Sequence, residues 1–252
     1  MNTQASEWQT KELSKIFLEG VRGAIPGADL QFEVIAKITQ VWCRSPKSVL
    51  DLGCGNGILG RYLLTLFPSA RGHFVDFSEP MLAAARENLR SLPQATIGRG
   101  DFSTPQWLEG VSSHRPFDIV ISGFAIHHQP DERKREIYSE IFDLLSPGGV
   151  FLNLEHVASL TKAGEGLFDD FFVDHLYGFH QKRNPSSTRA KVAQSYADRP
   201  DKKENVLAQV DAQCRWLREI GFSDVDCFFK IFEFALFGGR KIIQQDAASN
   251  RR

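Results

Sequence analysis

The fold is decided by the stretch SVLDLGCGNG at residues 48–57. Its first half, Ser48 to Leu52, is an apolar run that predicts a buried β-strand, and its second half is a glycine-rich turn. A helical pattern follows, with apolar positions on one face at Ile58, Leu59, Tyr62, Leu63 and Leu66. A strand, a glycine-rich turn and a helix in this order predict a parallel α/β sheet that binds its ligand at the carboxyl end of the first strand.

The same alternation of short apolar runs and helical patterns continues to about residue 155. Further strands are expected at residues 72–76, 95–97, 117–121 and 150–154, and helices after Ser78 and from about Asp131 to Leu145. The chain then ends with a helix at about 207–217 and two strands at 225–231 and 233–237, which follow each other so closely that they must pair antiparallel or bend sharply. We therefore expect an α/β fold with a Rossmann-like seven-stranded sheet, an antiparallel last strand and helices on both faces.

The pattern divides the chain into four parts. These are an N-terminal helical cap (1–45, two helices joined at 25–27), a core (46–155), a helical insertion after the fifth strand (156–203), and the last helix and strand pair (204–252). One helix of the insertion carries a wide apolar face made of Leu167, Phe168, Phe171, Phe172, His175, Leu176 and Phe179. We expect this insertion to be a lid with a polar hinge at 184–200; ordinary core packed on the N-terminal helices is the alternative.

Composition excludes several classes of protein. The 252 residues include 30 Lys and Arg and 31 Asp and Glu, a balance that gives no general attraction to nucleic acid or to an anionic membrane. The short basic runs at 133–135 and 202–203 are expected to be solvated. No apolar stretch is long enough to span a bilayer, residues 1–11 carry no signal-peptide core, and the four cysteines are scattered. We expect a cytoplasmic protein without a membrane or metal site, which could form a homodimer.

Two cofactors compete for the glycine-rich turn. Gly55, Gly57 and Gly60 fit the dinucleotide fingerprint, which alone is weak evidence. Asp51 precedes the glycines, where its carboxylate would repel a pyrophosphate but attract the amino group of S-adenosyl-L-methionine. Asp76 ends the second strand and can accept hydrogen bonds from ribose hydroxyls, a feature that NAD enzymes share.

The third strand supplies the remaining evidence. Gly100, Asp101 and Phe102 follow it, so that an acid can accept from the adenine amino group and an aromatic ring can pack on the base. Together with Asp51, this motif favours S-adenosyl-L-methionine over NAD.

Five motifs of the sequence resemble those of a known enzyme family. VLDLGCGNG, VDFSEPML, GDF, FDIVISGFAIHH and LLSPGGVFLNLEH, in this order and spacing, resemble the class I S-adenosylmethionine-dependent methyltransferases. The likeness covers roughly residues 48–155 by motif. It implies that Gly53, Gly55 and Gly57 line the methionine end of the cofactor, Asp76 and Phe77 the ribose, and Met81, Asp101 and Phe102 the adenine. The remaining residues that we assign to cofactor binding are Arg22, Asp51, Cys54, Asn56, Gly100, Ser122 and Gly123.

A narrower resemblance concerns the ends of the chain. The stretch RGAIPG at 22–27, the helical insertion and the approach to the last helix are similar to the carboxy-S-adenosylmethionine synthases, which act in the modification of tRNA. That group uses an arginine to hold the extra carboxylate of its cofactor. Arg199 is the nearest candidate here, but Pro200 follows it and the surrounding match is loose.

The catalytic candidates are His127, His128 and Glu155. The two histidines follow the fourth strand and Glu155 follows the fifth, so all three are expected at the edge of the cofactor site. Imidazole titrates near neutral pH and can take a proton from a methyl acceptor. The alternatives are a histidine that caps a loop and a carboxylate that is merely solvated.

We therefore expect a methyltransferase that acts on a small-molecule acceptor held under the phenylalanine-rich insertion; a nucleic-acid substrate is disfavoured. Two alternatives remain: a carboxy-S-adenosylmethionine synthase-like enzyme and a non-catalytic S-adenosylmethionine-binding protein.

Overall fold

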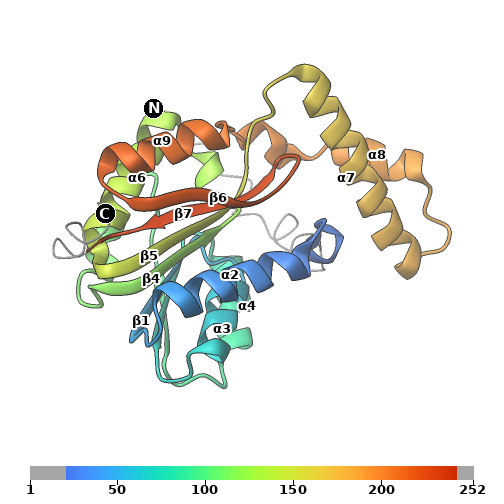
Figure 1. Ribbon diagram of the computed structural model, residues 1–252. Helices are drawn as coiled ribbons and strands as arrows, with labels where there is room; N and C mark the ends of the chain where they lie inside the picture. Colours follow the sequence, from blue (N-terminus) through green and yellow to red (C-terminus); the bar gives the residue numbers. More distant parts are fainter. Residues whose placement is uncertain (1–20, 243–252) are drawn as a thin grey trace.

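The computed structural model describes residues 21–242, and its centre is a seven-stranded sheet with strand order β3-β2-β1-β4-β5-β7-β6 (Figure 1). The strands are β1 (Ser48–Leu52), β2 (Arg71–Asp76), β3 (Ala95–Arg99), β4 (Phe117–Gly123), β5 (Leu145–His156), β6 (Ser223–Ile231) and β7 (Phe234–Arg240). The first five run parallel, whereas β7 is antiparallel to both β5 and β6. The expected Rossmann-like sheet with an antiparallel last strand is confirmed.

Helices cover both faces of this sheet. They are α2 (Ala28–Trp42), α3 (Ile58–Leu66), α4 (Glu79–Leu89), α5 (Trp107–Val111), α6 (Asp131–Leu144), α7 (Lys162–Arg183), α8 (Arg189–Ala197) and α9 (Val210–Ile220), with short 3-10 turns η2 (Val21–Ala24), η3 (Ile126–His128) and η4 (Pro200–Glu204). α2, α3 and α4 pack on one face, and α5, α6 and α9 pack on the other. The first helix expected in the N-terminal cap falls mostly outside the described residues.

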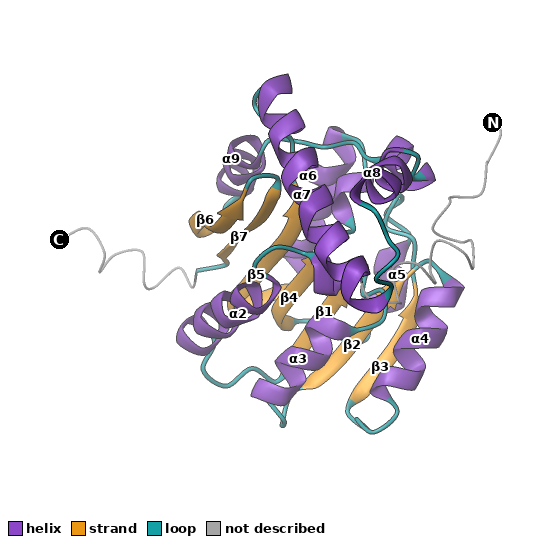
Figure 2. Cartoon of the chain, turned by 90° about the vertical axis from the view of Figure 1, so that its right-hand side faces the viewer, coloured by secondary structure: helices purple, strands orange, loops and turns teal. Residues whose placement is uncertain are grey.

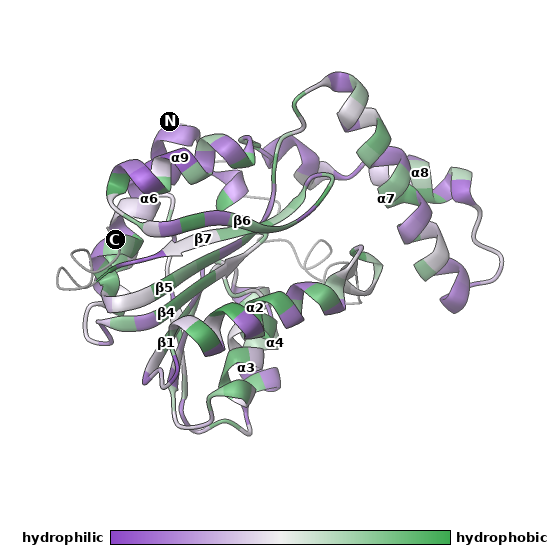
Figure 3. Cartoon of the chain, in the orientation of Figure 1, coloured by the Kyte–Doolittle hydropathy of each residue, from purple (hydrophilic) through white to green (hydrophobic). Residues whose placement is uncertain are grey.

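Alternation along the strands explains why the sheet needs two helical layers. Side chains of successive residues point to opposite faces, so Ile119 and Ile121 belong to the core under α2 to α4, while Val120 belongs to the core under α6 and α9. Figure 3 shows hydrophobic residues along the strands and, interspersed with hydrophilic ones, along the helices that pack on them. Since both faces of the sheet are covered, all five residues of a central strand such as β1 are buried.

Two strands extend at one end by three or more residues beyond the expected range. β5 begins at Leu145 instead of 150, because Leu145 pairs with Phe117 across a bulge. β7 continues to Arg240 instead of 237 through Gly238, where an added Cβ would lie 2.0 Å from the carbonyl oxygen of Phe151. Glycine ordinarily weakens a strand, but here it permits this close approach of β7 to β5.

Candidate cofactor and acceptor site

The glycine-rich turn leaves β1 in a conformation that only glycine adopts easily. Gly53 has a φ of 67°, and a Cβ there would lie 2.3 Å from the Cβ of Ala125. Gly55 has a φ of 54°, but no atom lies within 4 Å of the position that its Cβ would take. Gly53 therefore lets the turn pack against the loop after β4, whereas Gly55 exposes backbone to open space where a ligand can approach.

Two buried carboxylates fix the shape of this turn. Asp51 Oδ2 accepts a hydrogen bond of 2.8 Å from the backbone N–H of Gly60 in α3. Asp76 Oδ2 accepts one of 2.8 Å from Gly55 N, and its Oδ1 accepts one of 2.8 Å from Ser78 N. Burial raises the pKa of Asp76, although the backbone N–H groups that face it act in the opposite direction. Asp76 thus joins the turn after β1 to the end of β2.

The residues assigned to the adenine lie on the neighbouring strand ends. Asp101 is exposed and accepts a hydrogen bond from Ser103 N, while Met81 and Phe102 are buried. The ring of Phe102 lies 3.3 Å from the position that a Cβ on Gly53 would take. Phe77 is half-buried and directly follows Asp76. The structure therefore brings the loops after β1, β2 and β3 together, as expected from the sequence.

Several other residues that were predicted to bind the cofactor make hydrogen bonds or packing contacts within the protein. Ser122 Oγ donates to Leu52 O at 2.7 Å, and a Cβ on Gly123 would lie 2.4 Å from Leu59 Cδ1. Burial raises the pKa of the Cys54 thiol well above its usual range, so the thiol stays protonated. Asn56 O accepts a hydrogen bond from Asn88 Nδ2. Gly57 precedes α3, and Gly100 N donates to Asp76 O. Arg22 lies in η2, but its side chain is outside the described part of the structure.

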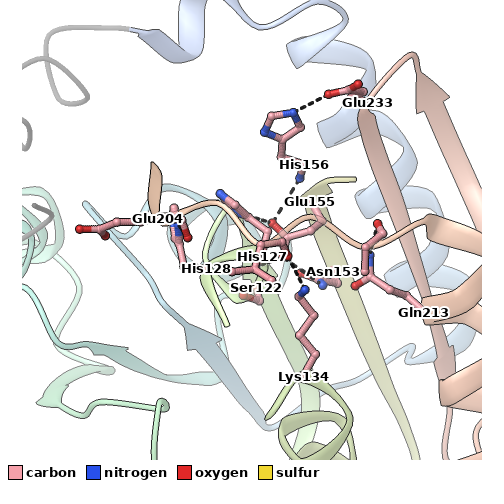
Figure 4. Close-up of polar contacts among 12 residues, drawn as sticks. Ser122, His127, His128, Lys134, Asn153, Glu155, His156, Glu204, Gln213 and Glu233 are labelled. Carbon is pink, nitrogen blue, oxygen red and sulfur yellow. Dashed lines mark hydrogen bonds and ion pairs between the residues drawn. The ribbon is translucent and has the colours of Figure 1, made fainter. Parts of the chain in front are cut away.

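On the acceptor side, the structure places two of the three catalytic candidates in direct contact. His127 Nδ1 lies 2.6 Å from Glu155 Oε1, and the backbone N–H of His127 donates to Glu155 Oε2 at 3.0 Å (Figure 4). Glu155 is fully buried at the carboxyl end of β5, and burial raises its pKa to about 7. The ring of His128 lies against that of His127, with centroids 3.9 Å apart and planes tilted by 42°. Burial lowers the pKa of His128 to about 3, so this second ring stays neutral at ordinary pH.

Comparison with known proteins identifies the type of domain to which these residues belong. Residues 49–149 match the model of a methyltransferase domain. The carboxy-S-adenosyl-L-methionine synthase of Pseudoalteromonas translucida is 23% identical over 243 residues, which cover 91% of this chain and 94% of the relative. This part of the chain is therefore a methyltransferase domain of the class I, S-adenosylmethionine-dependent type. S-Adenosylmethionine is the cofactor of this family, and the open backbone at Gly55 beside the Asp76 carboxylate and the Phe102 ring fits it.

Two further likenesses are narrower. The ribosomal RNA large subunit methyltransferase G of Shewanella pealeana is 39% identical over 116 residues, which are 41% of this chain but only 27% of that protein. An O-methyltransferase family protein from Burkholderia thailandensis has a similar structure, with a TM-score of 0.58 and 17% sequence identity. That match covers 88% of this chain and 62% of the other, so the chain spans less than two thirds of the length of this structural relative.

A chain of buried polar residues, which sequence reasoning missed, continues behind Glu155 in the methyltransferase. Asn153 Nδ2 lies 3.4 Å from Glu155 Oε2 and donates to Tyr138 OH at 3.3 Å, and Tyr138 in turn donates to Gln213 Oε1. Gln213 Nε2 donates to Ala208 O at 3.1 Å. One signal was available: Asn153 is a polar residue in the middle of the apolar run VFLNLEH. Polar residues in such a buried strand indicate a hydrogen-bonded network.

The basic run at 133–135 was interpreted wrongly, because two of its three residues are buried. Lys134 is fully buried, and its Nζ donates to Asp131 Oδ1 at 2.7 Å and to the carbonyl oxygen of Val206. Val206 N donates to His127 O at 2.9 Å. The segment that returns from the insertion to α9, residues 204–208, is therefore attached directly to the loop that carries His127 and to α6.

A second His–Glu pair lies next to the first. His156 Nε2 is 2.8 Å from Glu233 Oε2, and Ser159 Oγ donates to the other oxygen of this carboxylate (Figure 4). The rings of His156 and His127 are 5.9 Å apart. Glu233 lies between β6 and β7, so this pair ties the end of β5 to the final strands.

The helical insertion lies at the carboxyl ends of the strands. α7 and α8 project from this end in Figure 1, and α7 lies in front of the sheet in Figure 2. The apolar face of α7 contributes Phe168, Phe172, Val173 and Leu176 to a buried cluster. The other members of this cluster are Ala24, Ile25, Val192, Tyr196 and Phe234. Leu167, which we assigned to this face, is 62% exposed, and 184–200 is largely helix α8 instead of a polar hinge.

No group of three His, Cys, Asp or Glu side chains that could hold a metal ion occurs within residues 21–242. Within the same part of the chain, no helix combines the length and hydropathy needed to cross a membrane.

Proposed function

We propose that this methyltransferase transfers the methyl group to a small-molecule acceptor, with His127 as general base and Glu155 as its partner. The observation that carries the proposal is the contact of 2.6 Å between His127 Nδ1 and the buried carboxylate of Glu155. A carboxylate at Nδ1 holds the proton on that nitrogen and leaves Nε2 as the atom that accepts a proton from the acceptor. The same carboxylate stabilises the imidazolium that then forms.

When bound, S-adenosylmethionine supplies a sulfonium-activated methyl group, and its transfer leaves the neutral thioether S-adenosylhomocysteine. The protein must orient the acceptor, remove its proton and exclude water. The insertion supports the last task, because α7 and α8 lie over the strand ends and residues 204–208 are hydrogen-bonded to His127. His128 is the weaker base candidate, since its ring has a much lowered pKa.

A small acceptor is favoured over RNA by charge and by the enclosing insertion. The net charge of −1 provides no electrostatic attraction for a polyanion, which ordinarily dominates binding to nucleic acid. The test uses S-adenosylmethionine with a radiolabelled methyl group and a cell extract separated into small molecules, RNA and protein. Label in the small-molecule fraction, lost with His127→Gln, supports the proposal; label confined to RNA contradicts it.

Carboxy-S-adenosylmethionine synthesis is a second candidate, and a specific observation favours it. The relative from Pseudoalteromonas translucida, which bears this name, matches along 94% of its length, including the insertion region. In this reaction the bound sulfonium would be modified instead of donating its methyl group. Arg199, which would hold the added carboxylate, is half-buried at the start of η4. The mass of the purified ligand separates the two candidates.

A further inference from the structure

Arg133 connects α6 to the loop that carries the predicted adenine-binding residues. Its guanidinium is buried, and Nε donates a hydrogen bond of 2.8 Å to the carbonyl oxygen of Phe102. Phe102 belongs to the GDF motif after β3, whereas Arg133 lies in the first turns of α6, directly after the loop of His127 and His128. One side chain thus reaches from the acceptor side of the site to the cofactor side.

The other end of the guanidinium is held by a carboxylate with suitable geometry. Glu140 accepts two hydrogen bonds from it, of 2.7 Å at Nη1 and 2.8 Å at Nη2, and Glu136 accepts a third of 2.9 Å. Trp107 Nε1 also donates to Glu140, at 2.7 Å. The loop from Phe102 to Trp107 is therefore attached to α6 at both ends. This network needs the planar fork of arginine, because a lysine has a single cationic nitrogen.

Phe102 lies next to Gly53 of the glycine-rich turn. Its ring lies 3.3 Å from where a Cβ on Gly53 would stand, and Gly53 in turn packs against Ala125. Three loops, after β1, β3 and β4, therefore meet at this ring. A displacement of the Phe102 carbonyl would move the ring relative to the glycine-rich turn and change the space for a purine.

We propose that Arg133 is a positioning residue that fixes the adenine side of the cofactor site by holding the Phe102 carbonyl. The proposal rests on the placement of Phe102 in that site, which belongs to the proposed function. Arg133 touches neither cofactor nor acceptor in this account. Its loss should weaken recognition of the base and leave recognition of the amino-acid end intact.

The experiment compares two ligands, S-adenosylhomocysteine and S-ribosylhomocysteine, which lacks the adenine ring. Their dissociation constants are measured by calorimetry and by competition for the wild type and for Arg133→Gln, Glu140→Gln and Arg135→Gln. Arg135 is the matched control, because it lies on the same helix and is exposed, with its guanidinium over Trp216. Glu140→Gln keeps Arg133 in place and weakens its anchor, so it preserves the test if Arg133→Gln does not fold.

For Arg133→Gln we expect about a tenfold loss of S-adenosylhomocysteine affinity, the scale of one charge-assisted hydrogen bond, and unchanged affinity for S-ribosylhomocysteine. Glu140→Gln should show a smaller loss in the same direction, and Arg135→Gln none. Unchanged binding of S-adenosylhomocysteine by a folded Arg133 or Glu140 variant would overturn the proposal, as would an equal loss for both ligands. A wild type that binds no S-adenosylhomocysteine would instead remove the cofactor site itself.

Discussion

His127 Nδ1 and Glu155 Oε1 are 2.6 Å apart, although His127 follows β4, Glu155 lies near the end of β5, and the two belong to separate motifs of the sequence. The contact forms because β4 and β5 are parallel neighbours, with Gly123 opposite Leu154 in the register. Their carboxyl ends therefore meet at one edge of the sheet. In the proposed mechanism, this contact is what allows His127 to act as a base.

Removal of the Glu155 charge should lower turnover. Glu155→Gln retains the shape of the side chain but no longer stabilises an imidazolium, so we expect kcat to fall by a factor of about 10² to 10⁴ with little change in S-adenosylhomocysteine affinity. Glu233→Gln, which alters the neighbouring His156 pair, is the matched control and should retain near wild-type turnover. Equal kcat values for Glu155→Gln and wild type would remove the pair from catalysis.

The same pair predicts an acid limb in the pH profile of kcat. Burial raises the Glu155 pKa from its ordinary value to about 7, so the carboxylate is increasingly protonated as the pH falls below 7. The protonated acid no longer stabilises an imidazolium, and kcat should decline over that range. In a stopped assay between pH 5 and 9, a rate that rises on acidification would contradict this assignment.

Asp76 should determine cofactor affinity. Asp76→Asn preserves the shape but removes the charge that would receive ribose hydroxyls, and hydrogen bonds to charged groups contribute about 1.5–3 kcal/mol. We therefore expect S-adenosylhomocysteine to bind about tenfold to a hundredfold more weakly in calorimetry. Asp118→Asn is the control, because Asp118 also accepts backbone hydrogen bonds, from Lys47 and Ser48. Asp118 lies at the beginning of β4, whereas Asp76 lies at the carboxyl end of β2. Equal losses in both variants would indicate general damage to the fold.

Two glycines of the turn should respond differently to the same substitution. Gly53→Ala places a Cβ 2.3 Å from that of Ala125 and should lower the melting temperature strongly. Gly55→Ala meets no atom within 4 Å, so it should cost only the strain of a positive φ, about 1 kcal/mol, while the new methyl group occupies the ligand's space. Thermal melts and S-adenosylhomocysteine titrations measure both effects. Undiminished binding by Gly55→Ala would show that the ligand lies elsewhere.

The insertion should close when the cofactor binds. Arg189 at the start of α8 forms ion pairs with Asp170 and Asp174 of α7, so the two helices should respond as one unit. Hydrogen exchange with and without S-adenosylhomocysteine should show greater protection at 164–200 and in the glycine-rich turn. If protection rises only at 51–57, 76–81 and 101–102, the insertion is static structure and the lid interpretation is wrong.

The sequence was most informative where one local pattern determines the geometry. The glycines at 53 and 55 and the acid at 76 predicted a ligand site at the carboxyl ends of the strands, because parallel strands bring these positions together. It was least informative for Arg133 and Lys134, whose charges suggested a solvated helix. Their partners, Phe102 and Val206, are distant in sequence. Tertiary contacts of this kind satisfy a buried charge without leaving a local pattern.

The mass of the ligand that accompanies the purified protein tests the account most directly. Native mass spectrometry, followed by release of the ligand, distinguishes S-adenosylmethionine, S-adenosylhomocysteine, the carboxylated derivative and NAD, because their masses differ. The account predicts S-adenosylmethionine or S-adenosylhomocysteine in the wild type and loss of either with Asp76→Asn. Recovery of the carboxylated derivative would contradict methyl transfer as the reaction, and recovery of NAD would contradict the cofactor.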